Sequence, residues 1–127
     1  MAGTKIMIVD DESEFAATLA ERLELRGLEV ITADCGEQAI ANVREGWNPD
    51  VVLLDLKMPG LDGLETLELI KNHDPSIEVI ILTGHGSVAS GINGMKRGVF
   101  DYLMKPVDLG ELLGKLDQAV KKRRAGQ

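Results

Sequence analysis

The run VVLLD at residues 51–55 decides the fold. Four consecutive apolar residues are typical of a parallel strand that helices cover on both faces. Asp55 then ends this strand with a carboxylate, and burying a carboxylate is costly unless a charge or a hydrogen bond compensates it. The run therefore predicts a central strand with a charged site at its carboxyl end.

Other short runs with the apolar or β-branched content of strands flank this one: Lys5–Val9, Leu28–Thr32, Glu78–Leu82 and Asp101–Met104. With Val51–Leu54 included, the runs begin at residues 5, 28, 51, 78 and 101, which is the spacing of repeated strand–helix units. Strands that alternate with helices form a parallel sheet with right-handed crossovers. We expect an α/β fold, a doubly wound five-stranded parallel sheet in three layers, over a single domain of residues 1–127. Such folds place their chemistry at the carboxyl ends of strands.

Helical patterns lie between the predicted strands. Their expected first or capping residues are Ser13, Gly36, Asp62, Ser87 and Asp108. The first helix is expected to bury an apolar stripe formed by Phe15, Leu19, Leu23 and Leu25. Gly27 is expected to end this helix. The third helix is expected to stop before Pro75, because proline disfavours helix at the preceding residue.

The composition limits the possible functions. At 127 residues, with 44% hydrophobic and 28% charged residues, the chain is typical of one folded globular domain. Its apolar runs are too short to span a bilayer and no signal peptide precedes the first strand, so we expect a cytoplasmic protein without a membrane partner. Cys35 is the only cysteine, which excludes an intramolecular disulfide or a thiolate metal cage within the chain.

The charge also restricts the partners. A net charge of −7 argues against direct nucleic-acid binding, which needs a clustered positive surface. The basic run Lys121–Arg124 is interpreted as a solvated helix end, with its cations near the negative pole of the helix dipole. The alternative is that residues 121–127 begin a linker.

Polar residues gather at the ends of four predicted strands: Asp10, Asp11 and Glu12, then Asp55, Thr83 and Lys105. Carboxylates forced together raise one another's pKa unless a cation intervenes, and Mg²⁺ prefers such hard oxygen ligands. A lysine beside them supplies a fixed positive charge for a phosphoryl group. This environment suits an aspartate nucleophile in phosphoryl transfer.

Each of these residues also has a purely structural interpretation. Acids after a strand often begin a helix, a threonine often caps a strand, and a lysine before proline often lies in a solvated loop. These interpretations stay open for each residue taken alone. Their joint occurrence at four strand ends favours a single site.

The sequence resembles the receiver (CheY-like) domain of two-component response regulators along nearly its whole length. The matching motifs are IVDDE at 8–12, LLDLKMPGLDG at 53–63, ILTGHG at 81–86 and DYLMKP at 101–106. The segments TGHGS at 83–87 and MKRGVFDYLMKPVDLGELL at 95–113 are most similar to receivers of the nitrogen-regulation activator type. The implied fold is the flavodoxin-like (βα)5 architecture.

The resemblance implies a role for each motif residue. Asp55 matches the phosphoacceptor, Thr83 the switch hydroxyl, Tyr102 the aromatic switch residue and Lys105 the lysine that pairs with the phosphoryl group. The metal ligands for Mg²⁺ would be Asp10, Asp11, Asp55 and the backbone carbonyl of Lys57. The backbone amides expected to face the phosphoryl oxygens are those of Leu56 and Gly84. The peptide bond between Lys105 and Pro106 is expected to be cis.

The resemblance also implies partners. A sensor histidine kinase or a phosphotransfer protein would donate the phosphoryl group, and the chain would catalyse its own phosphorylation without being a turnover enzyme. The surface of the fourth helix, the fifth strand and the fifth helix would form a homodimer or contact an output domain or target. The two helices of that surface contain glycines that weaken them, namely Gly91, Gly94, Gly110 and Gly114. We therefore expect this surface to have low local stability.

Three other functions compete with this one. A phosphatase of the haloacid-dehalogenase type also uses an aspartate nucleophile and Mg²⁺, but it needs a second aspartate two residues later, and Asp55 is followed by Leu56 and Lys57. Nucleotide binding lacks a P-loop or a GxGxxG motif. A pure interaction module would not need the complete set of acids, threonine and lysine.

Overall fold

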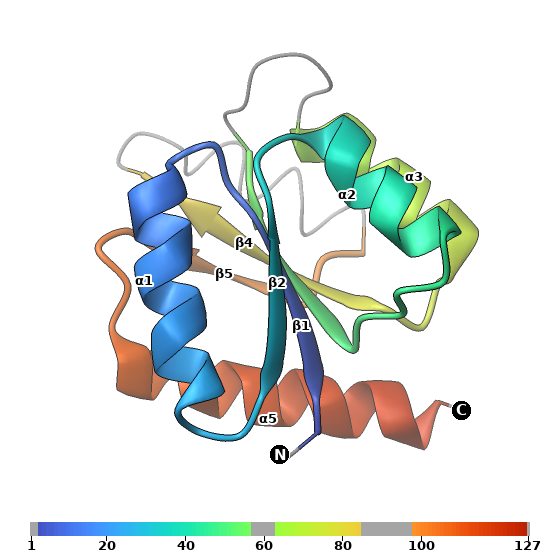
Figure 1. Ribbon diagram of the computed structural model, residues 1–127. Coiled ribbons are helices and arrows are strands. Elements are labelled where there is room, and N and C mark those ends of the chain that lie inside the picture. The colour runs from blue at the N-terminus through green and yellow to red at the C-terminus, as the bar shows by residue number, and fades with distance from the viewer. Residues whose placement is uncertain (1–2, 57–62, 85–97, 127) are drawn as a thin grey trace.

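The computed structural model describes residues 3–56, 63–84 and 98–126, and all of the following refers to these (Figure 1). Five parallel strands form one sheet in the order β2-β1-β3-β4-β5. The strands are β1 (Lys5–Val9), β2 (Glu29–Ala33), β3 (Val51–Asp55), β4 (Glu78–Thr83) and β5 (Asp101–Met104). The predicted doubly wound parallel sheet is confirmed, with β2 shifted by one residue from the expected range.

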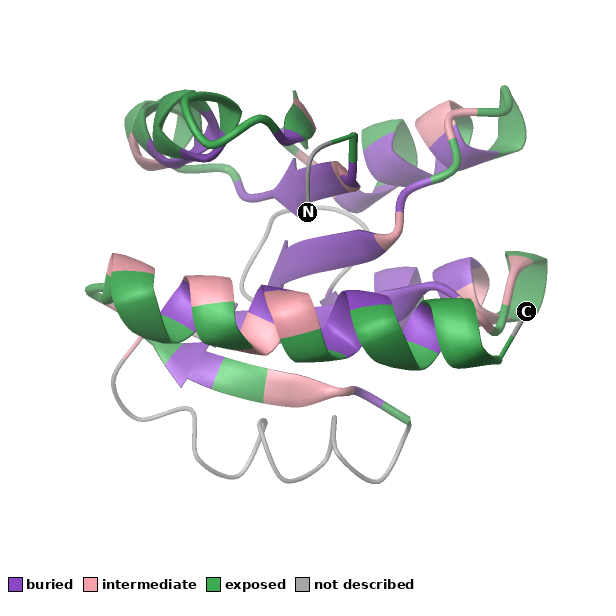
Figure 2. Ribbon diagram, turned by 90° about the horizontal axis from the view of Figure 1, so that it is seen from below, coloured by how far each residue is buried: buried purple, intermediate pink, exposed green. Residues whose placement is uncertain are grey.

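Helices cover both faces of the sheet. The helices within the described ranges are α1 (Ser13–Glu24), α2 (Gly36–Arg44), α3 (Gly63–His73) and α5 (Leu109–Ala125). One buried cluster joins α1 and α5 to one face, and a second joins α2 and α3 to the other. Figure 2 shows the middle of the sheet buried and α5 exposed on its outer side. The three-layer prediction is therefore confirmed, whereas the helix expected after Ser87 and the cap expected at Asp62 lie outside the described residues.

Local sequence signals explain where the helices begin and end. Asp108 caps α5, its side chain accepting a hydrogen bond from the backbone N–H of Glu111 at 2.9 Å. After α1 the chain turns at Gly27, whose φ of 85° suits glycine. No helix of the described segments is long and apolar enough to cross a membrane.

Leu25 corrects one expectation. The sequence placed it in the apolar stripe of the first helix, but α1 ends at Glu24 and Leu25 is 81% exposed. Two positions along a helix correspond to about half a turn. Leu23 is fully buried against the sheet, so Leu25 points away from it.

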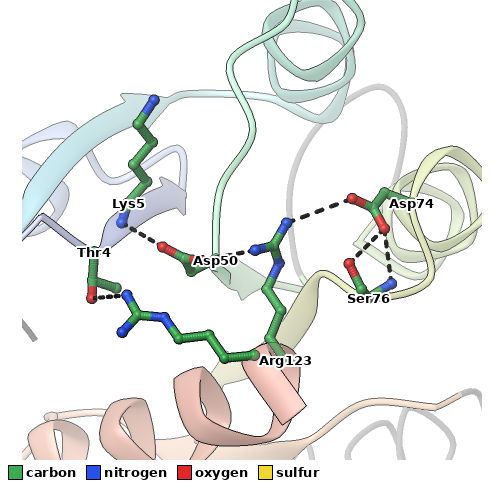
Figure 3. Close-up of polar contacts among 7 residues, drawn as sticks. Thr4, Lys5, Asp50, Asp74, Ser76 and Arg123 are labelled. Atoms are coloured by element: carbon green, nitrogen blue, oxygen red, sulfur yellow. Dashed lines mark hydrogen bonds and ion pairs between the residues drawn. The ribbon is translucent and has the colours of Figure 1, made fainter. Parts of the chain in front are cut away.

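The end of α5 corrects a second expectation, because Arg123 is not part of a solvated basic run. Its side chain is only 6% exposed, while Lys121, Lys122 and Arg124 are exposed. Nη1 of Arg123 donates to Oδ1 of Asp50 at 2.9 Å, and Nη2 lies 3.7 Å from Oδ2 of Asp74 (Figure 3). The guanidinium thus joins the last helix to the amino-terminal edge of the sheet.

Asp50 is the centre of that polar network. Its Oδ2 accepts a hydrogen bond from the backbone N–H of Lys5 at 2.9 Å, and its own backbone bonds both Lys5 and Glu78. Asp74 accepts hydrogen bonds from the hydroxyl and the backbone N–H of Ser76. The side chain of Asp50 therefore ties the start of β1 to α5 at the sheet edge opposite to the strand ends that carry the predicted site.

Candidate phosphoryl-transfer site

The predicted site residues lie on the carboxyl edge of the sheet. Asp10 directly follows β1, Asp55 is the last residue of β3, Thr83 ends β4, and Lys105 directly follows β5. Strand pairing aligns these ends, with Val9 opposite Leu54 and the last residue of β3 opposite Leu82. The topology thus gathers residues from four strands at one edge.

Three carboxylates form the acidic part of the site. Asp10, Asp11 and Asp55 each offer an oxygen, and these atoms all lie within 4.8 Å of one another. Asp10 and Asp55 are buried and Asp11 is exposed, so the cluster opens to solvent on one side. Three acids this close repel one another, and hard oxygen ligands at this spacing fit a divalent cation. The cluster is therefore able to hold a metal ion.

Lys105 supplies the positive charge of the site. Its Nζ lies 2.7 Å from Oδ2 of Asp10, 2.7 Å from Oε1 of Glu12 and 3.9 Å from Oδ2 of Asp55. The ring of Phe15 lies beneath the ammonium, with its centroid 4.5 Å from Nζ. Lys105 is thus held on the side of the turn between β1 and α1, within reach of Asp55 but not hydrogen-bonded to it.

Burial alone would lower the pKa of Lys105. The hydrogen bonds to Asp10 and Glu12 and the charges of Asp10 and Asp55 outweigh burial, so the pKa of Lys105 is raised above its ordinary value. The lysine is therefore fully charged at neutral pH. Its cation offsets part of the repulsion among the acids.

The turn after β1 holds the first acid in place. Oδ1 of Asp10 accepts a hydrogen bond from the backbone N–H of Glu12 at 2.9 Å, and the backbone N–H of Asp10 donates to the carbonyl of Ala33. Glu12 is the N-cap residue of α1, so the same turn begins the helix. Both oxygens of Asp10 are thereby oriented, one by the turn and one by Lys105.

Gly63 determines how closely α3 approaches the end of β3. A Cβ at this position would lie 2.5 Å from Cα of Leu56 and 2.9 Å from the carbonyl oxygen of Asp55. Real Cβ atoms essentially never come so close to backbone atoms. Only glycine fits here without moving the backbone of the aspartate. Gly63 is the last residue of the motif at 53–63, but the sequence alone did not show why a glycine is needed there.

The structure describes some of the remaining predicted residues. Leu56 directly follows β3 and Gly84 directly follows β4. Tyr102, in β5, is 39% exposed, and the peptide bond between Lys105 and Pro106 is cis. Lys57 lies outside the described residues, and only the backbone of Thr83 is described.

One contact of the site was underestimated from the sequence. The sequence assigned Glu12 no individual role beyond minor support, yet its carboxylate is as close to Lys105 as that of Asp10. The two partners are 93 positions apart, and a single exposed glutamate after two aspartates carries no signal of such a pairing.

A parallel sheet of this order, with three carboxylates and a lysine at its carboxyl edge, is the architecture of a receiver-type α/β domain. Residues 6–117 match the family described as the response regulator receiver domain. The chain belongs to this family, a module of two-component signal transduction, and the predicted resemblance is confirmed.

Individual relatives agree. The chain is 36% identical over 123 residues to the C4-dicarboxylate transport transcriptional regulatory protein DctD of Pseudomonas aeruginosa, covering 97% of this chain and 26% of that protein. It is 37% identical over 113 residues to the DNA-binding transcriptional regulator NtrC of Klebsiella pneumoniae, covering 89% of this chain and 24% of that protein. The chain thus spans about a quarter of the length of these two curated relatives.

A solved structure shares the whole fold. The crystal structure of a response regulator receiver domain protein from Clostridium thermocellum superimposes with a TM-score of 0.92 at 38% identity, covering 98% of this chain and 99% of that one. At this identity the likeness extends beyond the fold to the family.

Proposed function

We propose that Asp55 is the phosphoacceptor of this receiver domain. The observation that carries the proposal is the position of its carboxylate, which lies in the three-acid cluster with the ammonium of Lys105 3.9 Å away. A phosphoryl group on Asp55 would bring further negative oxygens into reach of that ammonium. The family match over residues 6–117 supports treating residues 1–127 as one receiver domain.

In the proposed reaction, an oxygen of Asp55 forms a bond to phosphorus while the bond between phosphorus and a histidine nitrogen of the donor breaks. The donor is a sensor histidine kinase or a phosphotransfer protein, and its histidine nitrogen keeps the bonding electrons and takes up a proton. Asp10, Asp11 and Asp55 would hold Mg²⁺, with the carbonyl of Lys57 as a further ligand. When bound, Mg²⁺ neutralises charge on the phosphoryl oxygens.

The product is an acyl phosphate on the chain itself, so the domain is a signalling switch and not a turnover enzyme. Lys105 would stabilise the phosphoryl oxygens, with Thr83 and the backbone amides of Leu56 and Gly84 as further donors. We propose that Thr83 and Tyr102 then move and change the surface of β5 and α5. The exposed side chains of Tyr102 and Met104 on β5 support this surface as the place where the change is read.

That surface would form a homodimer or contact an output domain or target protein. The relatives DctD and NtrC are transcriptional regulators of about four times this length, which supports an output domain as one of these partners. We propose a cytoplasmic location, because both the donor kinase domain and such a target act there.

The test is chemical phosphorylation with acetyl phosphate and Mg²⁺, followed by intact mass measurement. Wild type should gain one base-labile phosphoryl group, and Asp55→Asn should gain none. Asp34→Asn is the matched control, because Asp34 directly follows β2 on the same edge of the sheet and is not part of the acidic cluster. It should be labelled like wild type.

Two outcomes would contradict the proposal. Unlabelled wild type would favour an interaction module that is not phosphorylated. Sustained hydrolysis of phosphate esters would favour the phosphatase.

A further inference from the structure

Lys105 has two close acidic partners, and they differ in kind. Asp10 has a fully buried side chain and belongs to the acidic cluster. The side chain of Glu12 is 64% exposed, and Glu12 is not one of the three carboxylates of that cluster. Within the described part of the chain, the charged partner of the Glu12 carboxylate is therefore this ammonium.

The backbone of Glu12 is fixed although its side chain is exposed. Its N–H donates to Oδ1 of Asp10 at 2.9 Å, and its carbonyl accepts a hydrogen bond from Ala16 at 3.0 Å. The carboxylate is thus presented to Lys105 from a fixed point at the start of α1. An ion pair with such an exposed partner is weak, so it can open at little cost.

Among the described residues, the closest contacts of Lys105 come from one short segment, and Asp55 lies farther away. Glu12, Asp10 and Phe15 lie within residues 10–15, on the side of α1, and the distance of 3.9 Å to Asp55 is too long for a hydrogen bond. An ammonium has three protons, and the carboxylates of Asp10 and Glu12 engage two of them. The third proton remains for Asp55, so a phosphoryl group there would compete with Asp10 and Glu12 only when it draws the ammonium closer.

We propose that Glu12 is a positioning residue that holds Lys105 away from Asp55 in the resting protein and lowers the affinity of the site for a phosphoryl group. Glu12 releases the ammonium when Asp55 is phosphorylated, because the phosphoryl oxygens offer more charge than one exposed carboxylate. The residue thereby sets the balance between the resting and the phosphorylated state. This inference rests on the proposed role of Asp55 as phosphoacceptor.

The test measures the binding of beryllofluoride, a phosphoryl analogue, by calorimetry at saturating Mg²⁺. Glu12→Gln removes the charge that competes for Lys105, and we expect it to bind the analogue about twofold to fivefold more tightly than wild type, the range set by one exposed ion pair. Glu14→Gln is the matched control: it removes the same charge two residues later, and Glu14 is exposed at the first turn of α1. It should bind like wild type.

A second pair of variants shows whether the effect acts through the lysine. In a Lys105→Met background, Glu12→Gln should no longer tighten binding. The inference is overturned if Glu12→Gln binds the analogue as wild type does or more weakly, or if the gain persists without Lys105. Wild type that binds no analogue, or binds it equally after Asp55→Asn, would instead refute the proposed phosphoacceptor.

Discussion

Replacing Arg123 by methionine should cost more stability than the same replacement at its neighbour Arg124. Methionine keeps much of the apolar volume of the buried side chain but removes the charge that Asp50 and Asp74 face. Breaking a buried ion pair on one side costs about 3–5 kcal/mol when the remaining charge stays buried. The size of the loss here depends on how well those two carboxylates are solvated.

Both carboxylates keep some compensation. The side chain of Asp50 is 15% exposed and retains the hydrogen bond from the backbone of Lys5, and Asp74 retains the hydroxyl of Ser76. Nε of Arg123 has no hydrogen-bond partner among the described residues, so the native guanidinium already carries a penalty. We therefore expect a loss below that range, about 2–3 kcal/mol. For a domain of this size that corresponds to a fall in Tm of roughly 6–15 °C.

The assay is urea unfolding followed by circular dichroism, with Arg124→Met as the matched control. Arg124 is the next residue and is exposed, and it makes one long hydrogen bond of 3.4 Å to the Thr4 hydroxyl, so its replacement should change the free energy of unfolding by less than about 1 kcal/mol. Combining Arg123→Met with Asp50→Asn should cost less than the sum of the two single changes. A loss below about 1 kcal/mol for Arg123→Met, or strict additivity with Asp50→Asn, would refute the reasoning.

Three smaller predictions concern Gly63, Gly114 and Asp74. Gly63→Ala should lower the free energy of unfolding by about 1–3 kcal/mol and slow the labelling of Asp55 by acetyl phosphate, because the new Cβ collides with the backbone of Leu56; unchanged urea unfolding would contradict this. Gly114→Ala should raise the stability by about 0.5–1 kcal/mol, because nothing lies within 4 Å of the added Cβ in α5, and a lower Tm would show that the helix does not tolerate it. The hydrogen bond from the Ser76 hydroxyl is the main cause that lowers the pKa of Asp74, so Ser76→Ala should raise that pKa, as measured by carboxyl NMR. A carboxyl whose pKa is lower in the folded than in the unfolded protein stabilises the fold at pH values above its unfolded pKa. This stabilisation is lost as the pH falls through the folded pKa, so the variant should lose it at a higher pH than wild type.

The part of the fold that follows from hydrophobic pattern and caps could be predicted. The apolar run of β3 identified a strand buried on both faces, and Asp108 identified the start of α5. The positions of Asp10 and Lys105 relative to Asp55 could also be predicted, because parallel strands bring their carboxyl ends to one edge.

Features that depend on three-dimensional neighbours could not be predicted in the same way. A basic run usually lies in solvent, so the burial of Arg123 was missed, although it lies seven residues after Leu116 and thus on the same face of α5. The exposure of Leu25 depends on where α1 stops, and the need for glycine at 63 depends on how closely α3 approaches β3. Helix ends and close backbone approaches are set by packing rather than by residue type.

The 95 positions between Asp10 and Lys105 have a consequence for biosynthesis. A chain emerges from the ribosome amino end first, so the acids of β1 and β3 are made long before the lysine that balances them. A nascent chain that has not yet reached β5 carries the carboxylates without their resident cation, and the sheet edge that would align them is incomplete. The pairing of the Asp10 carboxylate with the Lys105 ammonium can therefore form only after β5 has been translated and has joined the sheet.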